Sequence, residues 1–239
     1  MIQTGNAVFT GSKAVPVLLL LDVSGSMNDD KGAKINNLNN AVAGMIDFLK
    51  KDAAHNESFY IVGIITFGGD DAKKILPFTD VNKINWKPMT ADGGTPLGKA
   101  FKMAKDMIEA KEDKAVTGRC YVATVVLVSD GLPTDNIWEK TLDAFIGEGR
   151  TQKCDRWAMG IGSDVDEKML RRFAKPKEKP GDPEKYVCGA APDIAKFFEK
   201  VSQSVSMVSV PAPPPGPMVK GGLGGGVTVE SDPDDSEQV

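Results

Sequence analysis

The chain has 239 residues, of which 41% are hydrophobic, and its formal net charge is −4. This length and apolar content suffice for one good-sized core, so we expect a single domain with appendages and no membrane span. The acidic excess lies at the carboxyl end, because residues 216–239 carry five acidic side chains and one basic one. The rest of the chain is formally neutral, which gives no indication of a basic face for nucleic acid.

The amino-terminal segment and the cysteines predict a cytoplasmic setting. Residues 1–13, an expected amino-terminal extension, contain no basic region followed by an apolar stretch, so no signal peptide is predicted. Cys120, Cys154 and Cys188 are odd in number and widely separated. This spacing argues against both a disulfide framework and a zinc site, and it fits a reducing compartment.

Predicted strands and helices alternate along residues 14–207, the expected domain. The uninterrupted apolar run over residues 15–21 predicts a strand that is buried on both faces. The following segments are a helix over 34–51, strands over 58–67 and 74–78, a helix over 96–111, a strand over 121–129, a helix over 137–147, a strand over 156–161, a helix over 167–174, a strand over 185–188 and a helix over 192–207. The strand over 74–78 is expected to pair back as an antiparallel edge strand. The alternation predicts an α/β fold with a doubly wound, mainly parallel six-stranded sheet and helices on both faces.

Two aspartates end the strands that such a sheet places side by side. Asp22 follows the first strand, and Asp130 follows the strand that opens the second half of the sheet. The switch point of a doubly wound sheet, where ligands bind, lies between the carboxyl ends of these strands. A helix is expected to begin beside them, with Thr95 as its N-cap and Pro96 as its first residue.

Oxygen-bearing side chains follow the first strand at two-residue spacing. Asp22, Ser24 and Ser26 are hard oxygen donors, and Gly25 lets the chain turn so that they converge. Alone, this pattern also suits simple capping of the next helix. Two carboxylates about 5 Å apart, however, repel by about 3 kcal/mol at an effective dielectric near 20, and a divalent cation reverses that sign. The sequence therefore predicts a Mg²⁺ site, with Mn²⁺ and Ca²⁺ as alternatives.

Three motifs in this order resemble the von Willebrand factor A domain and its metal-ion-dependent adhesion site. They are Asp22-Val23-Ser24-Gly25-Ser26, Gly93-Gly94-Thr95 and Ser129-Asp130-Gly131. The resemblance, which covers residues 14–207, implies that Ser24 and Ser26 bind the cation through their hydroxyls. It implies that Thr95, Asp22 and Asp130 act directly or through bound waters. It also implies a coordination position that is open to a carboxylate of a partner protein.

Within this superfamily, four stretches are most similar to the bacterial tellurium-resistance TerY group. They are residues 18–22, 93–98, 130–135 and 157–162. The similarity implies a cytoplasmic binding protein of a stress or defence pathway, with a protein kinase or a PP2C-type phosphatase as candidate partner.

The segment 208–239 lies outside this resemblance and differs in composition. Five prolines within residues 211–217 predict a stiff spacer, and the glycine run over 221–226 predicts flexible chain before the acidic end. We expect this Pro- and Gly-rich tail to be disordered in the free protein and to add nothing to the stability of the domain.

Several residues in or beside the predicted upper loops are candidates for a partner-facing rim around the metal. They are Met27, Asn28, Trp86, Pro133 and Asp135. For the methionine, tryptophan and proline, local packing is the alternative interpretation.

Nucleotide binding and serine hydrolysis are both disfavoured by the residue pattern. Ala100 follows Lys99 where a phosphate-binding loop requires Ser or Thr. The single histidine, His55, lies in a polar stretch between a helix and a strand, where a solvated residue is expected rather than a catalytic base.

Three functions therefore remain as hypotheses. The first is a non-catalytic, Mg²⁺-dependent protein-binding module, whose site is completed by an Asp or Glu of a partner. The second is a metal-dependent phosphoester hydrolase with Asp22 as nucleophile or with a metal-activated water. Against it, Ser24 stands where a haloacid-dehalogenase-like phosphatase needs a second acid. The third is a scaffold with a structural metal and a docking tail.

Overall fold

The computed structural model describes residues 13–110 and 120–209, which form a six-stranded sheet between two layers of helices. The strands are β1 (Ala14–Asp22), β2 (Phe59–Gly68), β3 (Asp71–Asp80), β4 (Thr124–Ser129), β5 (Asp155–Ile161) and β6 (Tyr186–Gly189). Their order in the sheet is β3-β2-β1-β4-β5-β6. The β2–β3 pair is antiparallel and the other pairs are parallel. This topology confirms the predicted α/β fold, including the antiparallel edge strand.

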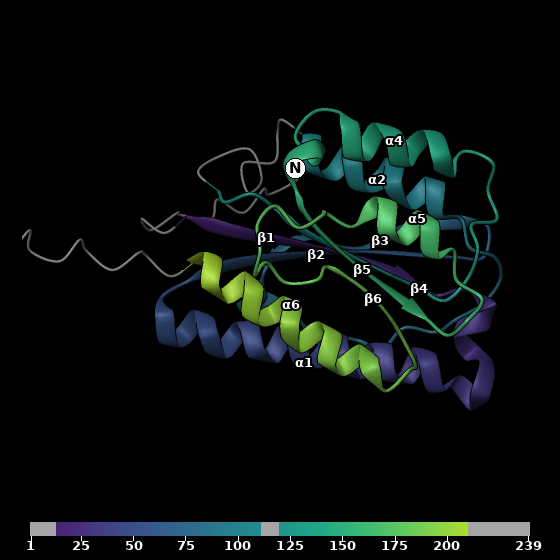
Figure 1. Ribbon diagram of the computed structural model, residues 1–239. Helices are drawn as coiled ribbons and strands as arrows, with labels where there is room; N and C mark the ends of the chain where they lie inside the picture. Colours follow the sequence, from purple (N-terminus) through teal and green to yellow (C-terminus); the bar gives the residue numbers. More distant parts are fainter. Residues whose placement is uncertain (1–12, 111–119, 210–239) are drawn as a thin grey trace, which may run out of the picture.

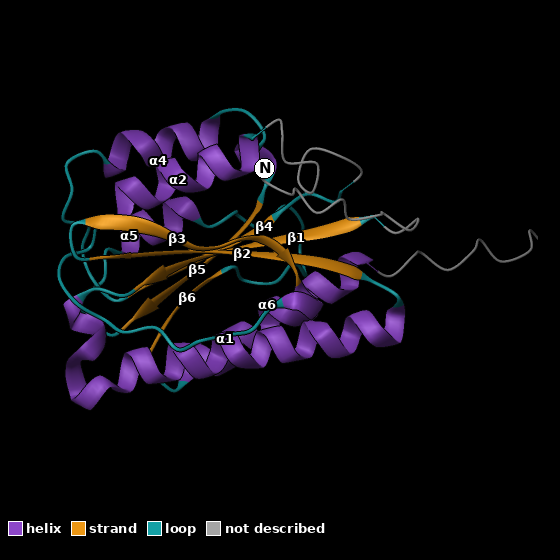
Figure 2. Cartoon of the chain, turned by 180° about the vertical axis from the view of Figure 1, so that it is seen from behind, coloured by secondary structure: helices purple, strands orange, loops and turns teal. Residues whose placement is uncertain are grey.

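The helices cover both faces of the sheet, as Figures 1 and 2 show. They are α1 (Asp29–Asn56), α2 (Leu97–Glu109), α4 (Trp138–Gly147), α5 (Glu167–Phe173) and α6 (Asp193–Ser209). One face carries α1 and α6, and the other carries α2, α4 and α5. Short 3-10 helices are η1 (Gly25–Asn28), η2 (Val81–Lys83) and η3 (Thr151–Lys153). None of the helices in the described ranges is long and apolar enough to cross a membrane.

The unbroken apolar run over residues 15–21 forms the central strand β1. All nine of its residues are buried, and it pairs with β2 on one side and β4 on the other. Leu19 and Leu21 point into the core under α1 and α6, whereas Leu18 and Leu20 point into the core under α2, α4 and α5. Each such leucine contributes about 2 kcal/mol through burial, so β1 fixes both layers and the position of Asp22 at its end.

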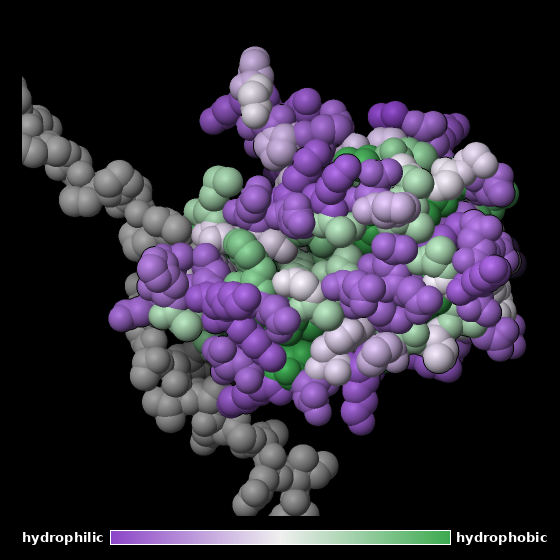
Figure 3. Space-filling model, turned by 90° about the horizontal axis from the view of Figure 1, so that it is seen from below, coloured by the Kyte–Doolittle hydropathy of each residue, from purple (hydrophilic) through white to green (hydrophobic). Residues whose placement is uncertain are grey.

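Helix α1 is longer than its predicted span of 34–51 but is interrupted near its start. Asp30, Lys31 and Gly32 have φ angles of 51°, 60° and 77°, so the continuous right-handed helix begins after Gly32, close to the predicted start. Its inner face joins the core, while Figure 3 shows that hydrophilic residues dominate the outer surface on this side of the molecule.

Two strands, β3 and β4, differ from the prediction by more than one residue. Strand β3 extends beyond the predicted 74–78 at both ends because it pairs with β2 along much of its length. Strand β4 starts at Thr124 rather than 121, and the chain before it meets β1 in an isolated bridge between Cys120 and Ala14, where Tyr121 N–H donates to the Ala14 carbonyl. The predicted extension over 1–12 and the tail over 210–239 lie outside the described residues.

Candidate metal centre

The sheet brings Asp22 and Asp130 to the same edge, as the topology predicts. Strand β1 is parallel to β4, with Leu21 in register with Val128. Asp22 ends β1, and Asp130 follows the last residue of β4. Both carboxylates therefore stand at the switch point, where the connections on either side leave in different directions.

Asp22 is wholly buried and its two carboxylate oxygens accept hydrogen bonds from neutral groups. The backbone N–H of Ser24 donates to Oδ1 at 2.8 Å, and the Ser129 hydroxyl donates to Oδ2 at 2.6 Å. Burial raises the pKa of Asp22 from 3.8 to about 6, because the loss of hydration outweighs these hydrogen bonds, and the nearby Asp130 adds to the rise. The negative charge of Asp22 is thus costly in the metal-free protein.

Two serine hydroxyls connect the two aspartates. Ser24 Oγ lies 3.1 Å from Ser26 Oγ, and Ser26 Oγ donates to Asp130 Oδ1 at 2.7 Å. The other oxygen of Asp130, Oδ2, accepts from the ammonium of Lys34 at 2.6 Å. Asp130 is therefore paired with a cation, in contrast to Asp22.

Thr95 reaches the site on a loop that backbone contacts hold in place. Gly25 N–H donates to the Gly93 carbonyl at 2.8 Å, and Thr95 N–H donates to Thr134 Oγ1 at 2.9 Å. Gly93 has a φ of 72°, and a Cβ there would lie 2.3 Å from the Gly69 Cα, so this close approach of two loops requires glycine.

The hydroxyls of the two loops border one small space. A Cβ built on Gly131 would lie 3.7 Å from Thr95 Oγ1 and 3.8 Å from Ser26 Oγ. Glycine at 131 thus keeps open a space that a side chain would fill, next to hydroxyl oxygens from two separate segments. Ser24 is buried and Ser26 half-buried, which suits donors that face inward.

The donor set fits a hard divalent cation. In the described ranges, no three His, Cys, Asp or Glu side chains gather closely enough to hold a metal ion by themselves, so a metal at this site would also need the hydroxyls. The five predicted ligands supply carboxylate and hydroxyl oxygens, which Mg²⁺, Mn²⁺ and Ca²⁺ accept. Cys154 and Cys188 are free thiols, and His55 is exposed in the last turn of α1.

The structure corrects the predicted positions of Thr95 and Pro96 and places Asp135 at the start of helix α2. Helix α2 begins at Leu97, with Pro96 in the N-cap position and no side-chain cap from Thr95. Instead, Asp135 Oδ2 accepts from Gly98 N–H at 2.7 Å, and its Oδ1 accepts from Ile137 N–H at 3.2 Å. Asp135 is half-buried and holds the start of α2.

Among the candidates for the partner-facing rim, the prediction for Met27 is wrong. Its side chain is wholly buried in the core that includes Leu38 of α1, since the 3-10 turn η1 points it inward. Asn28 is exposed beside the site, and Pro133 is half-buried. These two positions can face a partner.

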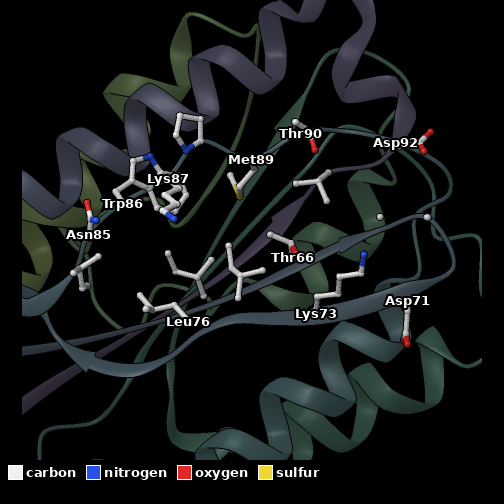
Figure 4. Close-up of a pocket in the computed structure, with 17 residues that line it drawn as sticks. Thr66, Asp71, Lys73, Leu76, Asn85, Trp86, Lys87, Met89, Thr90 and Asp92 are labelled. Carbon is white, nitrogen blue, oxygen red and sulfur yellow. The ribbon is translucent and has the colours of Figure 1, made fainter.

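Trp86 borders a separate groove beside the metal centre, shown in Figure 4. The groove has a volume of about 670 Å³ and lies between strands β2 and β3 and the segment 84–92. Asn39 of α1 fixes this segment, because its side chain exchanges hydrogen bonds of 2.8 and 2.9 Å with the backbone of Met89. Figure 4 places Trp86 at the end of the groove away from Asp92.

Lys34 is the site residue that sequence reasoning missed. Its only signal was its position in the first turn of the continuous part of α1, eight residues after Ser26. A lysine there is indistinguishable from a solvated surface lysine until the fold places Asp130 beside it.

Comparison with known proteins agrees with this geometry. Residues 17–132 match the family model of the von Willebrand factor type A domain. These residues, just under half of the chain, are therefore similar to a von Willebrand factor type A domain, abbreviated VWA below. No curated protein matches the chain.

Solved structures with the same fold come from distant proteins. One is proximal thread matrix protein 1 from the mussel byssus, whose metal-ion-dependent adhesion site (MIDAS) motif is occupied by zinc. It is 16% identical to this chain, and the match has a TM-score of 0.58 and covers 82% of this chain and 46% of that one. The pilus adhesin SpaC from Lactobacillus rhamnosus GG is 14% identical, with a TM-score of 0.61 over 84% of this chain and 31% of that one. The vWF domain of the pilus tip protein Mfa5 from Porphyromonas gingivalis is 12% identical, with a TM-score of 0.57 over 85% of this chain and 99% of that one. The chain thus spans less than half of the mussel protein and about a third of SpaC.

Proposed function

We propose that this VWA domain is a non-catalytic binding module whose metal site is completed by a carboxylate of a partner protein. The observation that carries the proposal is Asp22, a wholly buried carboxylate whose hydrogen-bond partners are neutral. Burying such a charge is costly unless a cation compensates it. The mussel protein with the same fold has a zinc-occupied MIDAS motif, which supports a metal at this position.

In this proposal, Asp22, Ser24, Ser26, Thr95 and Asp130 hold the cation, with Mg²⁺ as the expected ion and Mn²⁺ or Ca²⁺ as alternatives. The bound cation supplies positive charge and an open coordination position for an Asp or Glu of the partner. The chain's own residues orient it: Ser129 fixes Asp22, and Thr134 fixes the loop that carries Thr95.

The motif similarity to the TerY group leads us to propose a bacterial stress or defence pathway in the cytoplasm. The partner would be a protein kinase or a PP2C-type phosphatase that presents an acidic side chain. Nucleic acid, nucleotide and membrane are not among the proposed ligands. The exposed Asn28 and the half-buried Pro133 are the rim positions that support contact with such a partner.

The alternative of phosphoester hydrolysis is less well supported by the geometry. A nucleophilic Asp22 must reach its substrate, but both of its oxygens accept hydrogen bonds and its side chain is buried. Ser24 also replaces the second acid that a haloacid-dehalogenase-like enzyme would use. The scaffold alternative depends on the tail over 208–239, and deletion of 210–239 in a capture assay separates it from the metal-bridge proposal.

Affinity capture from the native cell tests the proposal, with the intact chain as bait in Mg²⁺ and then in chelator. We expect a kinase or phosphatase to be retained in Mg²⁺ and released by chelator. The Asp22→Asn variant should retain none, whereas Asp106→Asn, which changes an exposed aspartate of α2, should behave like the unchanged chain. Capture that is unaffected by both chelator and Asp22→Asn would contradict the metal bridge, and metal-dependent phosphatase activity of the purified chain would favour the hydrolase.

A further inference from the structure

Lys34 forms an unusual ion pair at the metal centre. Its Nζ lies 2.6 Å from Asp130 Oδ2, with the lysine side chain 18% exposed and the aspartate side chain 0% exposed. In the other ion pairs of the described residues, the acidic side chain is at least 27% exposed. The Lys34–Asp130 pair is thus the one among them whose acid is fully withdrawn from water, where charges act strongly on one another.

The backbone directs this lysine to the site. The turn with positive φ at Asp30–Gly32 ends just before Lys34, which lies in the first turn of the continuous helix. Helical side chains tilt toward the amino end of their helix, and the amino end of α1 adjoins the edge of the sheet where Asp130 lies. Lys34 can therefore place its ammonium against Asp130 while its stem remains half-buried.

The charges around the site show what this ammonium does. With Asp22 and Asp130 ionised, the two carboxylates and Lys34 leave one net negative charge, whereas the carboxylates alone would leave two. A divalent cation that approaches Asp130 meets an ammonium already bound to it. The two cations repel each other over a distance shorter than the screening length at physiological salt.

We propose that Lys34 is an internal cation that competes with the divalent cation for Asp130 and so lowers the metal affinity of the site. The inference rests on the proposed metal site and concerns its regulation. Lys34 stabilises the metal-free protein by neutralising Asp130, and it sets the concentration of metal that is needed to fill the site. Loading therefore responds to the supply of metal instead of being permanent.

Calorimetric titration with MgCl₂ and MnCl₂ tests the proposal on four variants and the unchanged chain. Lys34→Met removes the charge, and Lys34→Gln removes it while keeping an N–H donor for Asp130. Lys34→Arg keeps the charge, and Lys51→Met removes an exposed lysine from the distal part of the same helix. We expect Lys34→Met and Lys34→Gln to bind at least about tenfold more tightly than the unchanged chain, with the other two within about threefold of it.

Thermal unfolding adds a readout that does not depend on a partner. In metal-free buffer, Lys34→Met and Lys34→Gln should have lower midpoints than the unchanged chain, because Asp130 loses its counter-charge. Saturating Mg²⁺ should close or reverse this difference, since the cation then neutralises Asp130. Lys51→Met should show neither effect.

The outcomes separate the two proposals. Metal binding by the unchanged chain that Asp22→Asn abolishes, with no gain in either neutral Lys34 variant, would overturn the role of Lys34 and leave the metal site intact. Binding in neither the unchanged chain nor the Lys34 variants would overturn both. Binding that appears only when Lys34 is neutralised would support the competition in its strongest form.

Discussion

The ends of β1 and β4 carry equivalent aspartates in different electrostatic settings. Asp22 is held by a backbone amide and a serine hydroxyl, and burial raises its pKa to about 6. Asp130 is held by a serine hydroxyl and by the ammonium of Lys34. Neutral hydrogen bonds thus orient the buried carboxylate of Asp22 but do not compensate its charge, as the ammonium of Lys34 does for Asp130. Asp22 is therefore the side of the site that gains most from a divalent cation.

Substitution of Asp22 should have the largest effect on metal binding. Asp22→Asn keeps an acceptor for Ser24 N–H but removes the charge, so we expect calorimetry to detect no Mg²⁺ or Mn²⁺ binding, a loss of more than about a hundredfold. The metal-free variant should remain folded, because the packed strand β1 lies below the substituted position. Undiminished binding would place the metal elsewhere.

The pH dependence of stability should distinguish Asp22 from the remaining carboxylates. Since the folded pKa of Asp22 lies above its usual value of 3.8, the metal-free folded chain holds this proton more tightly than the unfolded chain. The resulting stabilisation is complete below about pH 4 and is lost as the pH rises through about 6, a decrease of up to about 3 kcal/mol in the free energy of unfolding. Metal binding should show the opposite trend and weaken below about pH 6, where the proton competes.

Denaturant titration of metal-free protein at several pH values measures this contribution of Asp22. It is the difference in the free energy of unfolding between the unchanged chain and Asp22→Asn. The subtraction removes the contribution of the other carboxylates. A difference that does not change between pH 4 and pH 7 would show that Asp22 is not the titrating group.

Substitution of Asp130 should destabilise the metal-free protein, in contrast to Asp22. Asp130→Asn leaves the ammonium of Lys34 without its counter-charge, so we expect the free energy of unfolding to fall by about 2 kcal/mol. This is less than the cost of breaking a fully buried pair, because Lys34 is partly exposed. Denaturant unfolding at pH 7 in metal-free buffer measures it. The double variant Asp130→Asn with Lys34→Met should recover part of the loss, and an additive result would show that the two groups do not interact.

Thr95 should contribute the smallest of these effects. Because Thr95 does not cap α2, Thr95→Val should leave stability nearly unchanged while reducing metal affinity by about tenfold through the lost hydroxyl. Thr134→Val is the matched comparison, since it removes the acceptor of Thr95 N–H and should reduce stability by about 1 kcal/mol. Calorimetry and thermal unfolding of both variants measure the two effects. Equal changes in metal affinity for both would indicate that Thr95 acts only through the position of its loop.

The pairing of β1 with β4 and the identity of the two aspartates at their ends could be predicted from the sequence. An unbroken apolar strand must be buried on both faces, and strands that alternate with helices can form only a few sheet topologies. In these topologies Asp22 and Asp130 lie at the same edge of the sheet, so their meeting could be predicted from the sequence pattern. The spacing of Asp22, Ser24 and Ser26 also indicated convergence, because these contacts are local.

The groups that serve the site from distant parts of the chain could be identified only in the folded protein. Asp135 caps α2 in place of Thr95, Met27 turns into the core, and Lys34 neutralises Asp130 across 96 positions of sequence. The physical reason is that a cap, a buried side chain or an ion pair is set by which groups the folded chain brings within a few ångströms. Local pattern describes only the nearest neighbours along the chain, so the same residues suited several roles until packing selected one.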